Sequence, residues 1–186
     1  MAKAVFLDRD GVINEKAPEG GYITRWEDFR VLPGTIESIR ELNRAGFFVV
    51  IVTNQRCVAK GLLTEADLKN LHRQMTESFT QAGATIDAIY YCPHELATCR
   101  CRKPAPGMLL DAAASHGIDL GASWMIGDSD IDVQAGKNAG CRTARLRSTE
   151  SMIHERENGA VGSAEADVVA ASLPDAIREI LHAVPA

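Results

Sequence analysis

The chain has 186 residues, of which 46% are hydrophobic and 24% are charged, and its formal net charge is -5. This length and apolar content suffice for one folded domain with a substantial core, and they exclude a chain that is disordered throughout. An acidic chain without a long run of lysine and arginine lacks the basic face that nucleic acid binding needs, so we expect no nucleic acid partner.

The N-terminal stretch and the cysteines indicate a cellular compartment. No apolar run is long enough for a signal-peptide core or a membrane span, so we expect a cytoplasmic protein with no membrane partner. In that compartment the five cysteines are better explained as metal ligands or buried thiols than as disulfides. Cys57 and Cys141 lie far in sequence from the other three, and we predict that both are small buried side chains.

Apolar runs rich in β-branched and aromatic residues predict the strands of a parallel sheet that is buried on both faces. The last two runs are shorter or more polar, and we expect them at the edges of the sheet. The predicted strands are residues 4–8, 47–54, 87–93, 123–128, 143–147 and 166–171.

Helical patterns lie between these runs. The longest begins at a predicted capping box formed by Thr64 and Asp67. Its apolar stripe consists of Leu68, Leu71, Met75 and Phe79. The predicted helices are residues 34–46, 64–83, 106–117, 128–140 and 172–184.

This alternation of strands and helices is typical of an α/β domain with a parallel sheet. No internal repeat, low-complexity segment or linker interrupts the pattern, so we expect one domain over residues 1–186. Residues 14–32 lack a clear period and are expected to form a long ordered loop. Long loops in compact domains are often functional.

Polar side chains end several of the predicted strands. They are Asp8, Thr53, the pair Cys92 and His94, and Asp128. In open parallel sheets, ligands bind at the carboxyl ends of the strands, so we expect these side chains to converge on one edge.

The stretch FLDRDGVIN places Asp8 and Asp10 two residues apart where the first strand ends, and Gly11 permits a sharp turn. Two carboxylates this close repel each other unless a cation or a shared proton lies between them. A divalent metal would relieve the repulsion and keep one carboxylate ionised as a nucleophile. The alternative is an ordinary turn or helix cap, where aspartate is common.

The stretch IGDSDID ends the fourth strand with Asp128, and Asp132 follows four residues later. Asp128 would complete an oxygen-rich site suited to Mg²⁺, which prefers carboxylate, carbonyl and water ligands. Asp132 would then lie on the same helix face. Its alternatives are direct contact with the metal or a favourable charge in the first turn of a helix.

The stretch VTNQ offers Thr53 and Asn54 at the end of the second strand. The hydroxyl, the amide and the free backbone N–H groups there can hold phosphoryl oxygens. Taken alone, the same pair is common in simple turns.

Cys92, His94, Cys99 and Cys101 place four metal ligands within ten residues, in a segment that we call the Cys/His loop (residues 92–101). Four protein ligands satisfy a tetrahedral Zn²⁺ and leave no open position, so the zinc would be structural. The alternative is four reduced, unligated side chains on a surface loop. Two cations, Arg102 and Lys103, follow the Cys/His loop directly.

Four motifs, in this order and spacing, resemble those of the haloacid dehalogenase (HAD) superfamily of phosphotransferases: DRDG, VTNQ, CRKP and GDSDID. Within it, FLDRDGVIN, KGLLTE and YYCPH…CRCRKPAPGM are similar to the heptose 1,7-bisphosphate phosphatases, with the histidinol-phosphate phosphatases as near relatives. The resemblance implies a Rossmann-like three-layer fold with a zinc-binding loop and without a large cap domain.

The resemblance also implies roles for these residues. Asp8 would attack phosphorus and form an aspartyl-phosphate, and Asp10 would act as general acid and base. Mg²⁺ would be held by Asp8, by the backbone carbonyl of Asp10 and by Asp128. The transferring phosphoryl oxygens would be bound by three further residues, Thr53, Lys103 and Arg102.

The implied substrate is a sugar phosphate, with the C7 phosphate of a heptose 1,7-bisphosphate as the group removed, and a monomer is expected. The 14–32 loop and the Cys/His loop would line the site. The expected substrate contacts are Glu19, Gly20, Gly21, Tyr22, Asn54, Gln55 and Arg56.

The chain departs from the heptose pattern in three places. Arg56 and Cys57 stand where the family has Ser-Gly, and Ser129 follows Asp128 where a basic residue is frequent. Only four residues separate His94 from Cys99, as in the histidinol-phosphate branch. Two alternatives therefore remain, a histidinol-phosphate phosphatase and a non-catalytic binding module built on the zinc loop.

Overall fold

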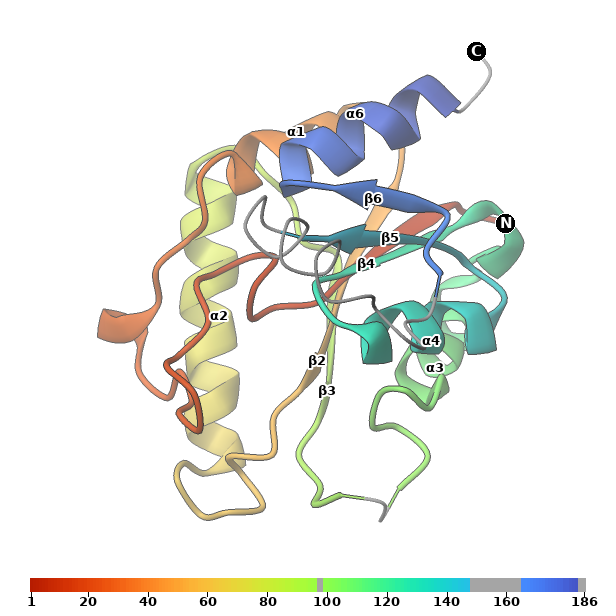
Figure 1. Ribbon diagram of the computed structural model, residues 1–186. Helices are drawn as coiled ribbons and strands as arrows, with labels where there is room; N and C mark the ends of the chain where they lie inside the picture. Colours follow the sequence, from red (N-terminus) through yellow and green to blue (C-terminus); the bar gives the residue numbers. More distant parts are fainter. Residues whose placement is uncertain (97–98, 148–164, 184–186) are drawn as a thin grey trace, which may run out of the picture.

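A computed structural model describes residues 1–96, 99–147 and 165–183. Its centre is a six-stranded sheet in the order β3-β2-β1-β4-β5-β6 (Figure 1), and all of the strand pairs are parallel. The strands are β1 (Ala4–Leu7), β2 (Phe48–Asn54), β3 (Ala88–Cys92), β4 (Trp124–Gly127), β5 (Arg142–Leu146) and β6 (Val168–Ala170).

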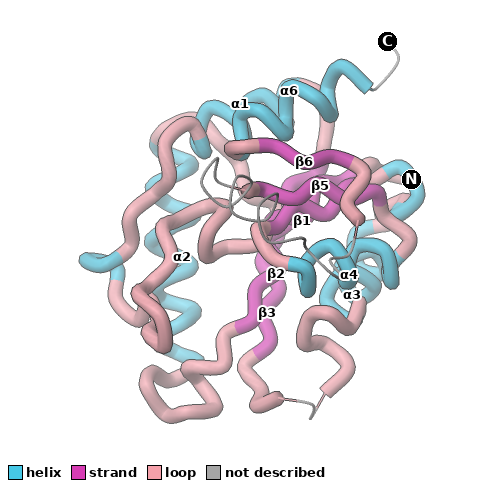
Figure 2. Tube along the Cα trace, in the orientation of Figure 1, coloured by secondary structure: helices cyan, strands magenta, loops and turns pink. Residues whose placement is uncertain are grey.

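Helices cover both faces of the sheet and give three layers (Figures 1 and 2). One face carries α1 (Thr35–Arg44), α2 (Glu65–Gln81) and α6 (Leu173–Ala183), and the other carries α3 (Gly107–His116) and α4 (Asp130–Ala139). Two short 3₁₀ turns, η1 (Trp26–Asp28) and η2 (Leu120–Ala122), complete the described elements.

The core follows from the two-residue period of the strands. In β1, Val5 and Leu7 pack into the core under α1, α2 and α6, whereas Ala4 and Phe6 pack against α3 and α4. All four are fully buried, as expected for a parallel strand covered by helices on both sides. The predicted burial of Cys57 and Cys141 is confirmed.

The register brings the strand ends to one edge. Leu7 at the end of β1 pairs with Ile51 in β2 and with Ile126 in β4. The residues that follow these positions therefore emerge side by side at the carboxyl edge. The predicted α/β class with a parallel sheet is confirmed, and the described segments between the strands are loops and single helices rather than a large cap.

The predicted strands and helices are confirmed with boundaries that differ by one or two residues, and one prediction is wrong. Residues 142–146 form β5, which lies between β4 and β6, so the edges are β3 and β6. This strand contains two arginines, Arg142 and Arg145, yet it is not at an edge of the sheet. Arg142 instead lies over the Trp124 ring at 5.3 Å, and Arg145 forms an ion pair with Asp130.

Helix α2 confirms the predicted capping box, because the Thr64 hydroxyl accepts from the Asp67 amide at 3.1 Å. The predicted stripe of four apolar residues on this helix is buried. Among the described residues, no helix combines the length and the apolar character needed to cross a bilayer.

Candidate active site

Asp8 emerges from the end of β1 at the centre of the carboxyl edge. Its amide donates to the Ile126 carbonyl of β4 at 3.0 Å, and its Oδ1 lies 2.8 Å from the Lys103 Nζ. Burial raises the pKa of the Asp8 carboxyl group to about 7. The Lys103 ammonium lowers this pKa, whereas the Asp132 and Asp10 carboxylates raise it further. Because the raised pKa disfavours the ionised carboxylate, a further cation beside Asp8 would stabilise it.

Lys103 is fixed by the sheet edge. Its Nζ donates to the Val52 carbonyl at 2.8 Å and lies 2.7 Å from Asp132 Oδ1, in addition to its contact with Asp8. The Asn54 side chain holds its backbone, accepting from the amide and donating to the carbonyl, both at 3.1 Å. Burial would lower the pKa of Lys103, but the Asp8 and Asp132 carboxylates outweigh that effect and raise it. Lys103 is therefore a buried, charged ammonium with a fixed position.

Asp132 lies at the start of α4, beside Lys103. It is fully buried, and as the third residue of α4 it closes a capping box with Ser129. Gly127 makes room for it, because a Cβ at that position would lie 2.1 Å from the Asp132 Cβ. The contacts of Asp132 thus serve the helix start and Lys103, although its carboxylate also lies near those of Asp8 and Asp128.

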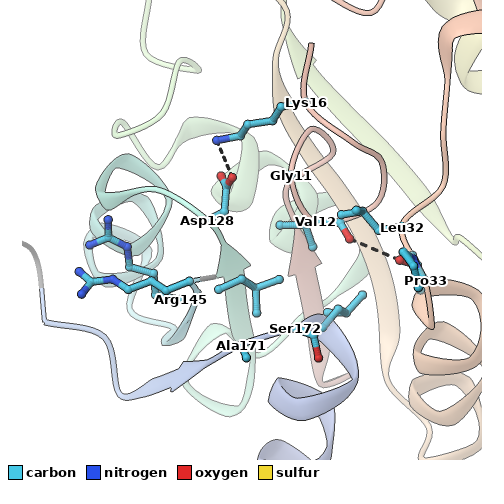
Figure 3. Close-up of a pocket in the computed structure, with 13 residues that line it drawn as sticks. Gly11, Val12, Lys16, Leu32, Pro33, Asp128, Arg145, Ala171 and Ser172 are labelled. Atoms are coloured by element: carbon cyan, nitrogen blue, oxygen red, sulfur yellow. Dashed lines mark hydrogen bonds and ion pairs between the residues drawn. The ribbon is translucent and has the colours of Figure 1, made fainter. Parts of the chain in front are cut away.

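Among the three carboxylates of this site, that of Asp128 would gain most from a bound cation. One ligand oxygen each from Asp8, Asp128 and Asp132 lies within 4.8 Å of the others. Asp128 Oδ2 contacts the exposed Lys16 ammonium at 2.5 Å (Figure 3), and the buried Oδ1 has no hydrogen-bond partner in the described part of the chain. Burial raises the pKa of Asp128 although Lys16 lowers it. These donors fit Mg²⁺, a hard cation that prefers oxygen ligands.

Gly11 keeps this cluster open. Its φ of +95° lies in the left-handed region, and a Cβ there would lie 2.1 Å from Asp128 Oδ2. Any other residue at position 11 would be strained and would displace the carboxylate.

Asp10 is held from behind by three buried side chains. Arg9 donates to both carboxylate oxygens, with Nη2 at 3.0 and 2.9 Å. Asn14 donates to Oδ1 at 2.9 Å and Gln55 donates to Oδ2 at 3.1 Å. The Asp10 side chain remains 29% exposed, and it faces a cavity of ≈ 230 Å³.

That cavity gathers most of the predicted substrate contacts. Glu19, Gly20, Gly21 and Tyr22 from the 14–32 loop line it together with Asp10 and Asn54. The two remaining predicted substrate contacts, Gln55 and Arg56, do not line this cavity. Gln55 is buried and donates to Thr53 Oγ1 at 2.8 Å as well as to Asp10, and Arg56 forms an ion pair with Glu95.

The four ligand atoms of the Cys/His loop lie together, and residues 97 and 98 of this loop fall outside the described residues. Cys92 Sγ is 3.5 Å from Cys99 Sγ and 3.6 Å from His94 Nδ1. Cys101 Sγ is 3.2 Å from Cys99 Sγ and 3.3 Å from His94 Nδ1. A tetrahedral Zn²⁺ with Zn–S near 2.3 Å separates its ligand atoms by about 3.5–3.8 Å, so this donor set fits zinc.

The thiols of the Cys/His loop perturb one another. Burial would raise the pKa of Cys99, but hydrogen bonds with the Cys101 and Cys92 thiols and with the Arg102 amide lower it to about 6. Burial and the Cys99 and Cys92 thiols raise the pKa of Cys101 to about 12. Arg102 directly follows the Cys/His loop, and its buried Nη1 has no hydrogen-bond partner among the described residues.

A second cavity, of ≈ 600 Å³, borders the site and is drawn in Figure 3. It reaches the carboxylates only through Gly11, Lys16 and Asp128. The rest of its lining comes from Val12, the end of β5 and the residue after it, the segment that leads into α6, and the segment that leads into α1. Neither Asp8 nor Asp10 lines it. Asp10 lines the smaller cavity and Asp8 lines neither of the two, so the smaller cavity is the one that would place a bound group beside the Asp10 carboxylate.

Sequence reasoning did not find four residues of this site. Arg9, Asn14 and Lys16 lie in or near the DRDG motif, and their charge or amide groups next to two aspartates were a usable signal. His72 offered none, because it lies 63 residues from Arg9, on an apolar helix face.

The fold and the site define a hydrolase of the HAD class, and a family model described as HAD-hydrolase-like matches residues 100–176. The D-glycero-β-D-manno-heptose-1,7-bisphosphate 7-phosphatase of Rhodopseudomonas palustris is 44% identical over 145 residues, 74% of this chain and 79% of that protein. The one from Yersinia pestis is 40% identical over 180 residues, 92% of each chain.

A solved structure agrees with these relatives. The D,D-heptose 1,7-bisphosphate phosphatase of B. bronchiseptica, complexed with magnesium and phosphate, has a TM-score of 0.86 and 33% identity over 98% of this chain and 99% of that one. The chain belongs to the family of the D-glycero-β-D-manno-heptose-1,7-bisphosphate 7-phosphatases.

Proposed function

We propose that this chain is a Mg²⁺-dependent phosphatase that removes the C7 phosphate from a D-glycero-β-D-manno-heptose 1,7-bisphosphate. The observation that carries the proposal is the arrangement of Asp8, which lies between the Lys103 ammonium and the Asp128 carboxylate, beside an Asp10 that faces a cavity. The names of relatives of about 40% identity supply the sugar.

In this mechanism Asp8 is the nucleophile. Its carboxylate attacks phosphorus, the bond to the sugar oxygen breaks, and an aspartyl-phosphate forms on Asp8. Asp10 gives a proton to the departing sugar oxygen and then takes one from the water that hydrolyses the aspartyl-phosphate. The exposed face of Asp10 toward the small cavity supports this role.

Fixed cations and donors would hold the phosphoryl oxygens. Lys103 is charged, buried and held by Val52 and Asn54, so it is pre-oriented for an anion. Thr53 adds a hydroxyl that is steadied by Gln55, and the unpaired Nη1 of Arg102 supports a further contact. Positioning and charge supply most of the catalysis in phosphoryl transfer.

The ligands for Mg²⁺ would be Asp8, Asp128 and the backbone carbonyl of Asp10. When bound, the metal neutralises charge on the transferring group and polarises its oxygens. Lys16, which contacts Asp128 in this structure, also lines the small cavity.

The sugar would lie in the cavity formed by the 14–32 loop, with Glu19, Gly20, Gly21, Tyr22 and Asn54 as contacts. All of these groups come from one chain, so a monomer suffices, and residues 1–186 act as a single domain. We assign a structural Zn²⁺ to Cys92, His94, Cys99 and Cys101, which must then stay reduced, as in the cytoplasm.

A substrate panel tests the proposal. Both anomers of the heptose 1,7-bisphosphate, the matching monophosphates and histidinol phosphate are compared by kcat/KM at saturating Mg²⁺. The β-anomer of the bisphosphate is expected to give the highest value, with loss of the C7 phosphate seen by ³¹P NMR. A higher value for histidinol phosphate would favour that alternative, which the short spacing between His94 and Cys99 supports.

A further inference from the structure

Arg9 is a fully buried arginine that links the catalytic edge to helix α2. On one side its Nε and Nη2 bind the Asp10 carboxylate at 2.9–3.2 Å. On the other side its Nη1 lies 3.3 Å from His72 Nε2. The Phe29 ring, with its centroid 6.0 Å from the Arg9 Cζ, lies nearby. A buried guanidinium of this kind is rare unless its charge and donors are matched.

The contact between Arg9 and His72 has a defined direction. A guanidinium only donates, so His72 Nε2 must be the unprotonated nitrogen that accepts. The environment agrees, because burial and the Arg9 charge lower the pKa of His72 to about 3, against a raising effect of Asp10. The imidazole is therefore neutral at physiological pH, and it is held by burial in α2 and by the Tyr91 ring, whose centroid is 5.8 Å away.

The Asp10 carboxylate has one side toward the protein interior and one side toward the cavity. Arg9, Asn14 and Gln55 are all buried, and they reach Asp10 from the protein interior. The exposed part of Asp10 faces the cavity that the 14–32 loop lines. A carboxylate clamped from behind in this way has one orientation toward that cavity.

We propose that Arg9 and His72 are positioning residues for Asp10, with His72 holding the guanidinium and the guanidinium holding the carboxylate in line with the leaving oxygen. This rests on the proposed phosphatase function and adds two residues to it. Neither residue touches substrate. Both act through the geometry of the proton transfer, where small displacements are costly.

A positioning role predicts a dependence on the leaving group. An alkoxide from a sugar is a poor leaving group and needs the proton from Asp10, whereas p-nitrophenolate leaves without one. Loss of the Arg9–His72 contact should therefore slow cleavage of a sugar phosphate more than cleavage of p-nitrophenyl phosphate. A change that only loosened the fold would slow both equally.

The experiment compares kcat/KM, relative to wild type, for both substrates in the Mg²⁺- and zinc-loaded enzyme. His72→Leu removes the acceptor and should lower the value for the sugar phosphate by about tenfold or more, with about a threefold effect at most for the aryl phosphate. His72→Gln keeps an acceptor oxygen and should restore most of the loss. Met75→Ala is the matched control, because Met75 is a fully buried neighbour on the same face of α2.

Arg9→Lys is an independent arm that does not need His72→Leu to fold. Lysine keeps the charge but cannot bridge both partners, so the same selective loss is expected. Equal losses for both substrates in His72→Leu and Arg9→Lys would overturn the proposal, as would a His72→Gln enzyme no better than His72→Leu. A wild-type enzyme that cleaves neither substrate would instead refute the phosphatase function itself, so the two failures are distinguishable.

Discussion

Two neighbouring regions of this molecule differ in what holds their functional side chains in place. At the carboxyl edge of the sheet, Lys103 is buried and Asp8 is mostly buried, and they contact each other and groups from β2, β4 and α4. In the Cys/His loop beyond β3, the four ligand atoms contact one another, and all come from ten residues of chain. The edge is organised by the fold itself, whereas the proposed zinc assignment makes the loop depend on a bound ion.

The boundary between the two regions falls between adjacent residues. Lys103 is held by Val52 and Asn54 of β2, so its position does not depend on the loop. The buried Nη1 of Arg102 has no such partner among the described residues. Of the two cations that follow the loop, Arg102 is therefore the one whose position would depend on it.

The largest loss of activity is expected from a substitution at the carboxyl edge of the sheet. Asp8→Asn should reduce turnover by at least about 10³-fold because it removes the nucleophile. In chelator the variant should melt no lower than wild type, since burial raises the pKa of Asp8 to about 7 and the ionised form is unfavourable there. Steady-state kinetics and thermal scans check both parts, and activity within tenfold of wild type would rule out this role for Asp8.

Asp10→Asn should lower kcat by about 10²–10⁴-fold through loss of the general acid and base. Unlike Asp8→Asn, it should also destabilise the protein, because Arg9 is completely buried and would lose its counter-charge. Removing one partner of a buried ion pair costs about 3 kcal/mol or more. Urea unfolding of the two variants side by side measures this difference, and equal stabilities would contradict it.

Damage to the loop should have a smaller effect. Cys99→Ser should reduce the zinc content well below one ion per chain and raise KM by about tenfold through Arg102, with kcat changed less because Lys103 stays anchored. Cys57→Ser, at a buried thiol outside the cluster, is the control and should keep its zinc. A loss confined to kcat would mean that the loop positions Lys103 after all.

The smallest expected effect is a pH dependence of stability from His72. Its folded pKa of about 3 lies below the unfolded value near 6.5. The folded state therefore binds fewer protons, and stability is lost as pH falls from 6.5 toward 3. Between pH 7 and pH 5 wild type should lose about 2 kcal/mol more than His72→Gln. Denaturant titrations at the two pH values measure the difference, and parallel losses would contradict a buried neutral imidazole.

The sheet and the candidate residues were predictable where the signal is local. Strand runs such as β2 and motif pairs such as Asp8 and Asp10 stand out in the sequence, and so does the capping box at Thr64. Contacts between distant segments were not predictable. Residues 143–147 were predicted at an edge, but Arg145 of this segment pairs with Asp130 at the start of α4. The contact of His72 with Arg9 exists only once α2 packs on the sheet.

The account depends most on the covalent step at Asp8, and one measurement addresses it directly. Asp10→Asn enzyme is mixed with p-nitrophenyl phosphate and Mg²⁺, quenched in acid within seconds, digested and examined by mass spectrometry. The aryl group leaves without acid catalysis while hydrolysis of the intermediate lacks its base, so a phosphoryl group should accumulate on Asp8. Release of nitrophenolate with no phosphoryl group on the protein, or with one on a residue other than Asp8, would contradict the account.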